Sequence, residues 1–109
     1  MQFVLHFVSR LENQFMYFEW DEEKEQINIK KHGIDFSTAA LVFGDENRIE
    51  KFDALHSLEE ERYITIGSIN GFLTVLMVVY TDRKDVIRII SARKATEKER
   101  KAYYGKKDY

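Results

Sequence analysis

The chain has 109 residues, of which 44% are apolar and 14% aromatic, a composition typical of one globular domain around one hydrophobic core. It contains no cysteine, which excludes disulfide bonds and thiolate metal sites. No apolar run approaches the roughly 20 residues that a membrane-spanning helix needs, so we expect a cytoplasmic protein with no membrane partner.

The net charge of −2 hides an uneven distribution of charged residues. Residues 83–107 carry ten Lys or Arg against three acidic residues, while residues 1–82 carry seven against fifteen. A basic end on an acidic body indicates a polyanionic ligand, an acidic partner or both. A solvated basic helix accounts for the same charges equally well.

The well-patterned part of the chain begins at Met16. We therefore expect residues 1–15 to be an N-terminal extension outside the fold, and residues 16–109 to form a single domain. Residues 17–20 predict a short strand that leads directly into the first helix.

Residues 21–32 predict a helix. Asp21 is suited to its N-cap, and Gly33 can adopt the left-handed conformation that ends helices. The last turn holds Lys31 and His32, whose positive charges suit a helix C-terminus. Capping alone accounts for cations there. Because histidine can exchange a proton near neutral pH, the pair is also a candidate for a cationic clamp with an acid–base group.

Residues 35–44 predict a second helix, because apolar residues recur at helical spacing between a capping Asp35 and a terminating Gly44. A short strand over 48–52 and a polar loop over 54–60 follow.

The second half of the chain predicts three consecutive antiparallel strands, over 62–67, 72–80 and 86–91. Asn70-Gly71 is a tight-hairpin signal, and residues 81–85 read as a polar turn. Thr96 and Glu99 form a capping box for a last helix, which ends near Gly105. Helices in one block and strands in the next predict an α+β fold, with two N-terminal helices packed on a small antiparallel meander and a C-terminal helix.

Two arginines of the last predicted strand are candidate phosphate ligands. Alternation over 86–91 places Arg88 on the face opposite the neighbouring isoleucines, and Arg93 follows at the strand end. A guanidinium held by aliphatic neighbours can bind a phosphate in bidentate fashion. The structural alternative is that each arginine pairs with a carboxylate of residues 59–61 across the sheet.

The segment 56–62 brings Glu61 and Arg62 to the mouth of a strand, where a base and a phosphate ligand would be useful. A solvated charged loop is the alternative. Three consecutive carboxylates at 59–61 also suggest a metal site, but adjacent residues on an extended chain point apart. The three histidines show no ligand spacing, so we expect no metal and no cofactor.

The predicted C-terminal helix and the residue before it mix cations with aromatic rings, which suits contacts to an RNA backbone and stacking on bases. The candidate RNA-binding residues are Lys94, Lys98, Arg100 and Tyr103. A plain amphipathic helix fits the same pattern.

The chain closely resembles the BrnT family of type II toxins, and three motifs carry the likeness. The pattern Phe-x-Trp-Asp-x-x-Lys-x-x-x-Asn-x-x-Lys-His-Gly runs from Phe18 to Gly33. His-Ser-x-x-Glu-Glu-Arg occupies residues 56–62, and Ile-Arg-Ile-Ile-Ser-Ala-Arg occupies residues 87–93. The resemblance covers about residues 16–104, with its motifs in the family's order.

The resemblance implies a ribonuclease toxin with a RelE-like fold, silenced by a BrnA-like antitoxin. Toxin and antitoxin would form a heterotetramer that represses its own operon, so the toxin would meet DNA only through that complex. The catalytic residues carried over from the family are Lys31, His32, Glu61, Arg62, Arg88 and Arg93.

Our hypothesis for the reaction is attack by the RNA's own 2′-hydroxyl without a metal. Lys31, His32 or Glu61 would withdraw the proton, and the arginines would stabilise the charge that develops on the phosphoryl oxygens. Two other functions stay open: a non-catalytic module that binds the antitoxin or nucleic acid, and a metal-dependent nuclease.

Overall fold

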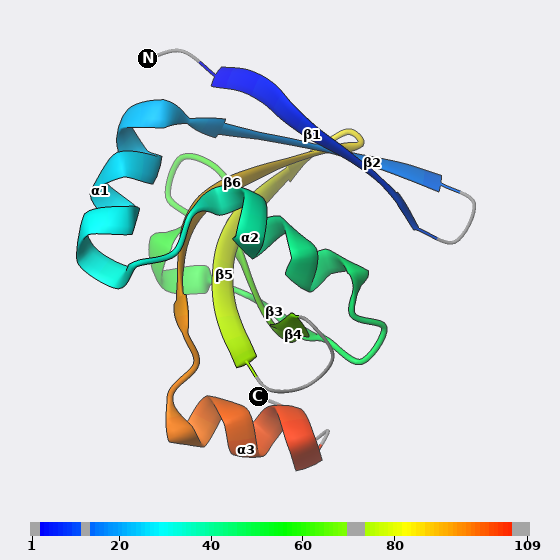
Figure 1. Ribbon diagram of the computed structural model, residues 1–109, viewed down its shortest axis with the longest axis vertical. Helices are drawn as coiled ribbons and strands as arrows, with labels where there is room; N and C mark the ends of the chain where they lie inside the picture. The colour runs from blue at the N-terminus through cyan, green and yellow to red at the C-terminus, as the bar shows by residue number, and fades with distance from the viewer. Residues whose placement is uncertain (1–2, 12–13, 70–73, 106–109) are drawn as a thin grey trace.

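The computed structural model describes residues 3–11, 14–69 and 74–105, and within them six strands form one sheet in the order β1-β2-β6-β5-β4-β3 (Figure 1). The strands are β1 (Phe3–Leu11), β2 (Gln14–Asp21), β3 (Ile49–Phe52), β4 (Tyr63–Ile69), β5 (Thr74–Arg83) and β6 (Val86–Lys94). The helices are α1 (Glu22–His32), α2 (Phe36–Ala40) and α3 (Glu97–Gly105), with short 3-10 helices η1 (Leu41–Gly44) and η2 (Ala54–His56).

The sheet is mixed, which corrects one part of the predicted fold. The expected antiparallel meander is present as β4, β5 and β6. However, β2 joins the other side of β6 in parallel, with residues 17–19 opposite 86–88. This pairing joins segments about seventy residues apart, and strand patterns in the sequence do not report on it. The combination of helices with a small sheet is as predicted, but α1 and α2 follow two strands, β1 and β2, and so do not form an N-terminal helical block.

Residues 1–15 were expected to lie outside the fold. Most of this segment, residues Phe3–Leu11, instead pairs antiparallel with β2 as an edge strand. The sequence between these two strands contains no glycine turn signal, and residues 12–13 lie outside the described residues. The boundary of the functional domain at Met16 stays a prediction.

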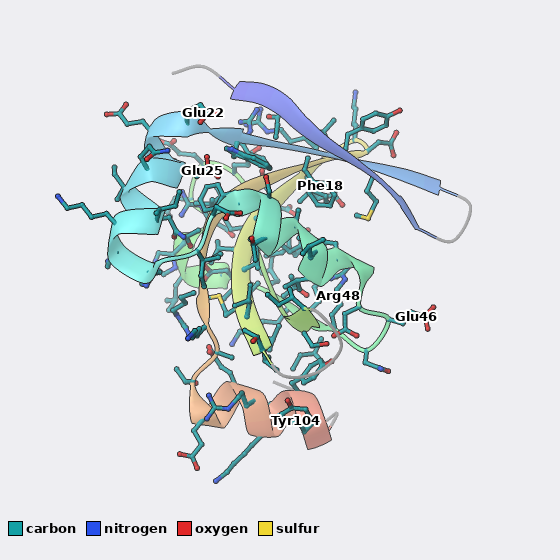
Figure 2. All side chains as sticks on the ribbon, in the orientation of Figure 1. Phe18, Glu22, Glu25, Glu46, Arg48 and Tyr104 are labelled. Carbon is teal, nitrogen blue, oxygen red and sulfur yellow. The ribbon has the colours of Figure 1, made fainter. Side chains whose placement is uncertain are left out.

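The predicted limits of α1 are confirmed at both ends. The Asp21 carboxylate accepts hydrogen bonds from the backbone N–H groups of Glu23 (2.8 Å) and Lys24 (3.3 Å). Gly33 has φ 73°, the left-handed conformation expected of a C-cap. Acidic side chains such as Glu22 lie at the N-terminal end of the helix (Figure 2), where they suit its dipole.

The second helix is divided into α2 and η1. Asp35 caps α2 by accepting a hydrogen bond from the N–H of Thr38 (2.7 Å), as its place in the sequence predicts. A carboxylate oxygen of Glu25 in α1 accepts a hydrogen bond from the N–H of Phe36 (2.9 Å), which ties the two helices together. In Figure 1, α2 crosses the front of the sheet and α1 lies beside β6.

The core lies mainly between the sheet and α2 with η1. Its largest fully buried side chains include Phe18, Trp20, Phe36 and Phe43. A second cluster forms on the opposite face, where Tyr103 of α3 packs beside residues of β4 and β5. None of the helices in the described ranges is long and apolar enough to cross a membrane.

β5 is longer than predicted. It continues to Arg83, so that only Lys84 and Asp85, with φ of 44° and 71°, make the turn expected over 81–85. The backbone of Thr81 therefore pairs with that of Arg88. The expected hairpin at Asn70-Gly71 lies outside the described residues.

Candidate functional site

Asn28 fixes α1 against β6. β2 pairs with β6 only as far as Arg88. Beyond that point the Asn28 side chain, in place of a strand, makes hydrogen bonds to the backbone of β6. Its Nδ2 donates to the carbonyl of Ala92 (2.9 Å), and its Oδ1 accepts from the N–H of the same residue (3.1 Å). Nδ2 also donates to the carbonyl of Ile34 (2.9 Å). These bonds hold the C-terminal half of α1 beside the sheet.

A pocket of about 360 Å³ lies between α1, β6 and the residue that precedes β4. Lys31 and His32 line it from α1, and Ile90 and Ser91 from β6. Arg62 closes the remaining side. The structure thus brings together three of the six predicted catalytic residues.

The three predicted catalytic side chains of this pocket make no polar contact with other described side chains. In the part of the chain that the structure describes, Lys31, His32 and the guanidinium of Arg62 make no side-chain hydrogen bond or ion pair. The backbone of Arg62 is fixed, because its N–H donates to Ser57 Oγ (2.9 Å), which donates in turn to the carbonyl of Asp53 (2.6 Å). An anion entering the pocket would therefore find positive groups with free donors on a fixed backbone.

Arg88 and Arg93 are both paired with carboxylates. Arg88 Nε donates to an oxygen of Glu19 (2.6 Å), and both side chains are mostly buried. Arg93 holds Glu99 through two hydrogen bonds of 2.8 and 3.0 Å. The alternative prediction, that each arginine pairs with a carboxylate, is confirmed. The expected partners in residues 59–61 were wrong, because the carboxylates are those of Glu19 and Glu99.

The Arg93–Glu99 pair attaches α3 to β6. Glu99 also accepts a hydrogen bond from the N–H of Thr96 (2.8 Å), and its own N–H donates to Thr96 Oγ1 (3.2 Å), which confirms the predicted capping box. The structure therefore gives Arg93 a contact that stabilises the fold.

Glu61 points away from the pocket. Its carboxylate accepts a hydrogen bond from the hydroxyl of Tyr63 (2.9 Å), whose ring packs against the core cluster on the α2 side of the sheet. Arg62 faces the other side, because neighbours on an extended chain alternate. The carboxylate that accompanies Arg62 is that of Glu60, which lines an adjoining pocket with it.

The partners of Glu60 and Arg88 were not predicted from the sequence. Glu60 forms an ion pair with Arg83, and Arg88 forms one with Glu19. Arg83 was assigned to a turn, which hid its alternation with Thr81 on the strand. Extending the predicted strand by three residues, from 80 to 83, would have placed Arg83 on the same face of the sheet as Arg88.

The four predicted RNA-binding residues divide into two groups. Lys94, Lys98 and Arg100 are exposed, as an RNA-contacting surface requires. Tyr103 is buried, with 5% of its surface accessible, and its hydroxyl donates to Asp45 Oδ2 (2.5 Å). It cannot stack on a base, so this prediction is wrong, and the exposed aromatic residue of α3 is Tyr104 (Figure 2).

The contact between Tyr103 and Asp45 makes the free energy of unfolding depend on pH in the acidic range. Burial raises the pKa of Asp45, but hydrogen bonds from Ser68, Tyr103 and Asn47 together outweigh burial and hold this pKa below its usual value of 3.8. A carboxylate whose pKa is lowered by folding stabilises the fold above its unfolded pKa. This contribution is lost as pH falls through the lower, folded pKa.

We therefore expect the free energy of unfolding to decline below about pH 4, and Asp45→Asn to reduce that decline. Denaturant titrations between pH 2 and pH 6 measure it. Glu46→Gln, which removes the neighbouring exposed carboxylate, is the matched control and should keep the wild-type profile. An acid decline of equal size in Asp45→Asn and wild type would contradict this role.

Within the described residues, no group of three or more His, Asp or Glu side chains is placed to hold a metal ion.

Comparisons with known proteins agree on one family. The family model described as "Ribonuclease toxin, BrnT, of type II toxin-antitoxin system" matches residues 20–99, a range that includes the pocket residues Lys31, His32 and Arg62. Among solved structures, the chain is similar to the crystal structure of the Brucella abortus ribonuclease toxin BrnT. The two share 30% sequence identity with a TM-score of 0.52, over 72% of this chain and 94% of that chain. A search of curated proteins gave no significant match.

Proposed function

Because the chain belongs to the BrnT family of ribonuclease toxins of type II toxin–antitoxin systems, we propose that it cleaves RNA in the pocket between α1 and Arg62. The family expected from the sequence is thereby confirmed. The observation that supports the proposed site is that Lys31, His32 and Arg62 line one pocket, with no partner for any of these side chains in the described residues.

The proposed reaction needs no metal. The 2′-oxygen of the RNA attacks the adjacent phosphorus, and the bond from phosphorus to the 5′-oxygen breaks. A pocket base takes the 2′-proton, and a pocket acid gives a proton to the leaving 5′-oxygen. The products are a 2′,3′-cyclic phosphate and a 5′-hydroxyl. Because a histidine side chain can both accept and donate a proton, His32 suits one of these two proton transfers.

Charge stabilisation is assigned to three cations. Lys31 and Arg62 line the pocket directly. Arg88 lies on the same face of β6 as Ile90 and is held there by Glu19. Positive groups fixed before the reaction stabilise the extra negative charge of the phosphorane-like transition state at little reorganisation cost. In this proposal Glu61 and Arg93 stabilise the fold through their contacts with Tyr63 and Glu99, and they do not contact the substrate.

An antitoxin partner follows from the family. We further propose that this partner is BrnA-like and that the two chains form a heterotetramer that represses its own operon. DNA would be contacted only through that complex. The RelE-like classification of the fold and a cytoplasmic location belong to the same proposal.

Cleavage in the presence of EDTA tests the reaction. We expect purified protein to cut RNA equally well with and without the chelator, and to leave 2′,3′-cyclic phosphate ends, which end-group analysis detects. Loss of cleavage in EDTA would identify a metal-dependent nuclease. Absence of cleavage in both conditions, with antitoxin binding retained, would identify a non-catalytic binding module.

A further inference from the structure

A cluster of three arginines lies beside the proposed cleavage pocket. Thr81 and Arg88 are paired across β5 and β6, and both face away from the core cluster that contains Tyr80 and Ile89. Arg83 follows Thr81 by two residues on β5 and shares its face. Arg62 precedes Tyr63, the residue paired with Tyr80, so it extends the register opposite Thr81. This register places on one surface the guanidinium groups of Arg83 in β5, Arg88 in β6 and Arg62, the residue that precedes β4.

The carboxylate of Glu60 lies among these arginines. It forms an ion pair with Arg83, and it shares a pocket wall with Arg62. Arg83, through this bond, holds the pKa of Glu60 below its usual value against the effect of burial, and the charges of Arg88 and Arg62 lower it further. All three arginines therefore act on one carboxylate.

A carboxylate surrounded by guanidinium groups has the same partners that a phosphate would have, because both are anions that offer a pair of oxygen acceptors to the paired N–H donors of an arginine. The floor of this cluster is polar as well. Thr81 is 1% exposed, and its hydroxyl has no hydrogen-bond partner among the described residues. Buried hydroxyl groups without a partner are uncommon in folded proteins, and this one is available to a polar ligand or a water molecule at the floor of the cluster.

We propose that Arg62, Arg83 and Arg88 form a phosphate subsite for RNA next to the cleavage pocket, and that the Glu60 carboxylate occupies this subsite until an RNA phosphate displaces it. The identity of the ligand as RNA rests on the proposed function. Glu60 thus competes with the substrate, and Arg83 is a further substrate-binding residue.

Binding of a 2′-O-methyl RNA oligonucleotide tests this subsite, because such a strand has no free 2′-hydroxyl and reports affinity alone. We expect Glu60→Gln to bind it about three- to fivefold more tightly, the size of a partly exposed ion pair. Glu59→Gln is the matched control, because it removes a neighbouring exposed carboxylate that has no ion pair in the described residues. It should change the affinity by less than about twofold.

Arg83→Gln tests the same subsite with an expected change of opposite sign. It should weaken binding and lower the slope of log affinity against log salt by about 0.7, the loss of one phosphate contact on a single strand. Equal affinities of Glu60→Gln and Glu59→Gln, or a wild-type salt slope in Arg83→Gln, would overturn the proposal. Since binding is the readout, the subsite can stand even if the EDTA experiment refutes metal-free cleavage, and the reverse also holds.

Discussion

Replacing Arg62 with glutamine is expected to lower RNA cleavage by about 100-fold or more, since removal of one fixed donor to a developing negative charge typically costs this much. The same change should leave the free energy of unfolding within about 0.5 kcal/mol of wild type. The reason is that the guanidinium of Arg62 makes no hydrogen bond or ion pair with any described residue. Single-turnover cleavage and denaturant unfolding measure the two effects separately.

Arg48→Gln is the control for this experiment. The Arg48 guanidinium bonds to Glu50 (2.8 Å) and to the hydroxyl of Thr65 (3.0 Å), so the variant should lose stability and keep its cleavage rate. Wild-type cleavage by a folded Arg62→Gln protein would exclude this pocket as the catalytic site. Arg88→Ala is a less clean probe, because it also leaves the mostly buried Glu19 without its partner.

Asn28→Ala is expected to lower the free energy of unfolding by about 2–4 kcal/mol, because it leaves buried backbone groups without their hydrogen-bond partners. Asn28 is 5% exposed, and its amide binds the N–H and the carbonyl of Ala92 together with the carbonyl of Ile34. Cleavage should fall as well, because Lys31 and His32 depend on the position of α1. Urea titration followed by a cleavage assay on the folded fraction measures both.

Gln26→Ala provides the comparison on the same helix, at an exposed position where alanine favours helix formation. It should leave both quantities near wild type. If Asn28→Ala and Gln26→Ala unfold at the same urea concentration, the Asn28 amide does not hold α1 on the sheet, and the position of the pocket needs another explanation.

The features that the sequence predicted correctly depend on residues close together in the chain. The caps of α1 join Asp21 to residues two and three positions later, and the capping box of α3 joins Thr96 to Glu99. Spacing alone identifies such contacts. The alternation of isoleucines around Arg88 was equally readable, because strand periodicity is local.

The features that the sequence did not predict join distant segments. The Asn28–Ala92 bonds span 64 residues and the Arg88–Glu19 bond spans 69. No pattern within either segment specifies the other. The prediction that Tyr103 binds RNA was wrong for a different reason. An aromatic residue among lysines gives the same sequence pattern whether its ring faces water or the core. Asp45, which accepts the hydrogen bond from its hydroxyl, lies 58 residues away in the sequence.

The way α1 is attached has a consequence for the energetics of the site. Asn28 is the one buried residue of this helix, so apolar burial, the main stabilising term for most helices in proteins, contributes little here. Segments with few buried contacts open locally before the whole molecule unfolds. A ligand that bridges α1 and Arg62 would bind only the closed form and would stabilise it by mass action. The affinity of the pocket and the local stability of α1 are therefore thermodynamically linked: a ligand raises the local stability of α1, and a change that opens α1 lowers the apparent affinity.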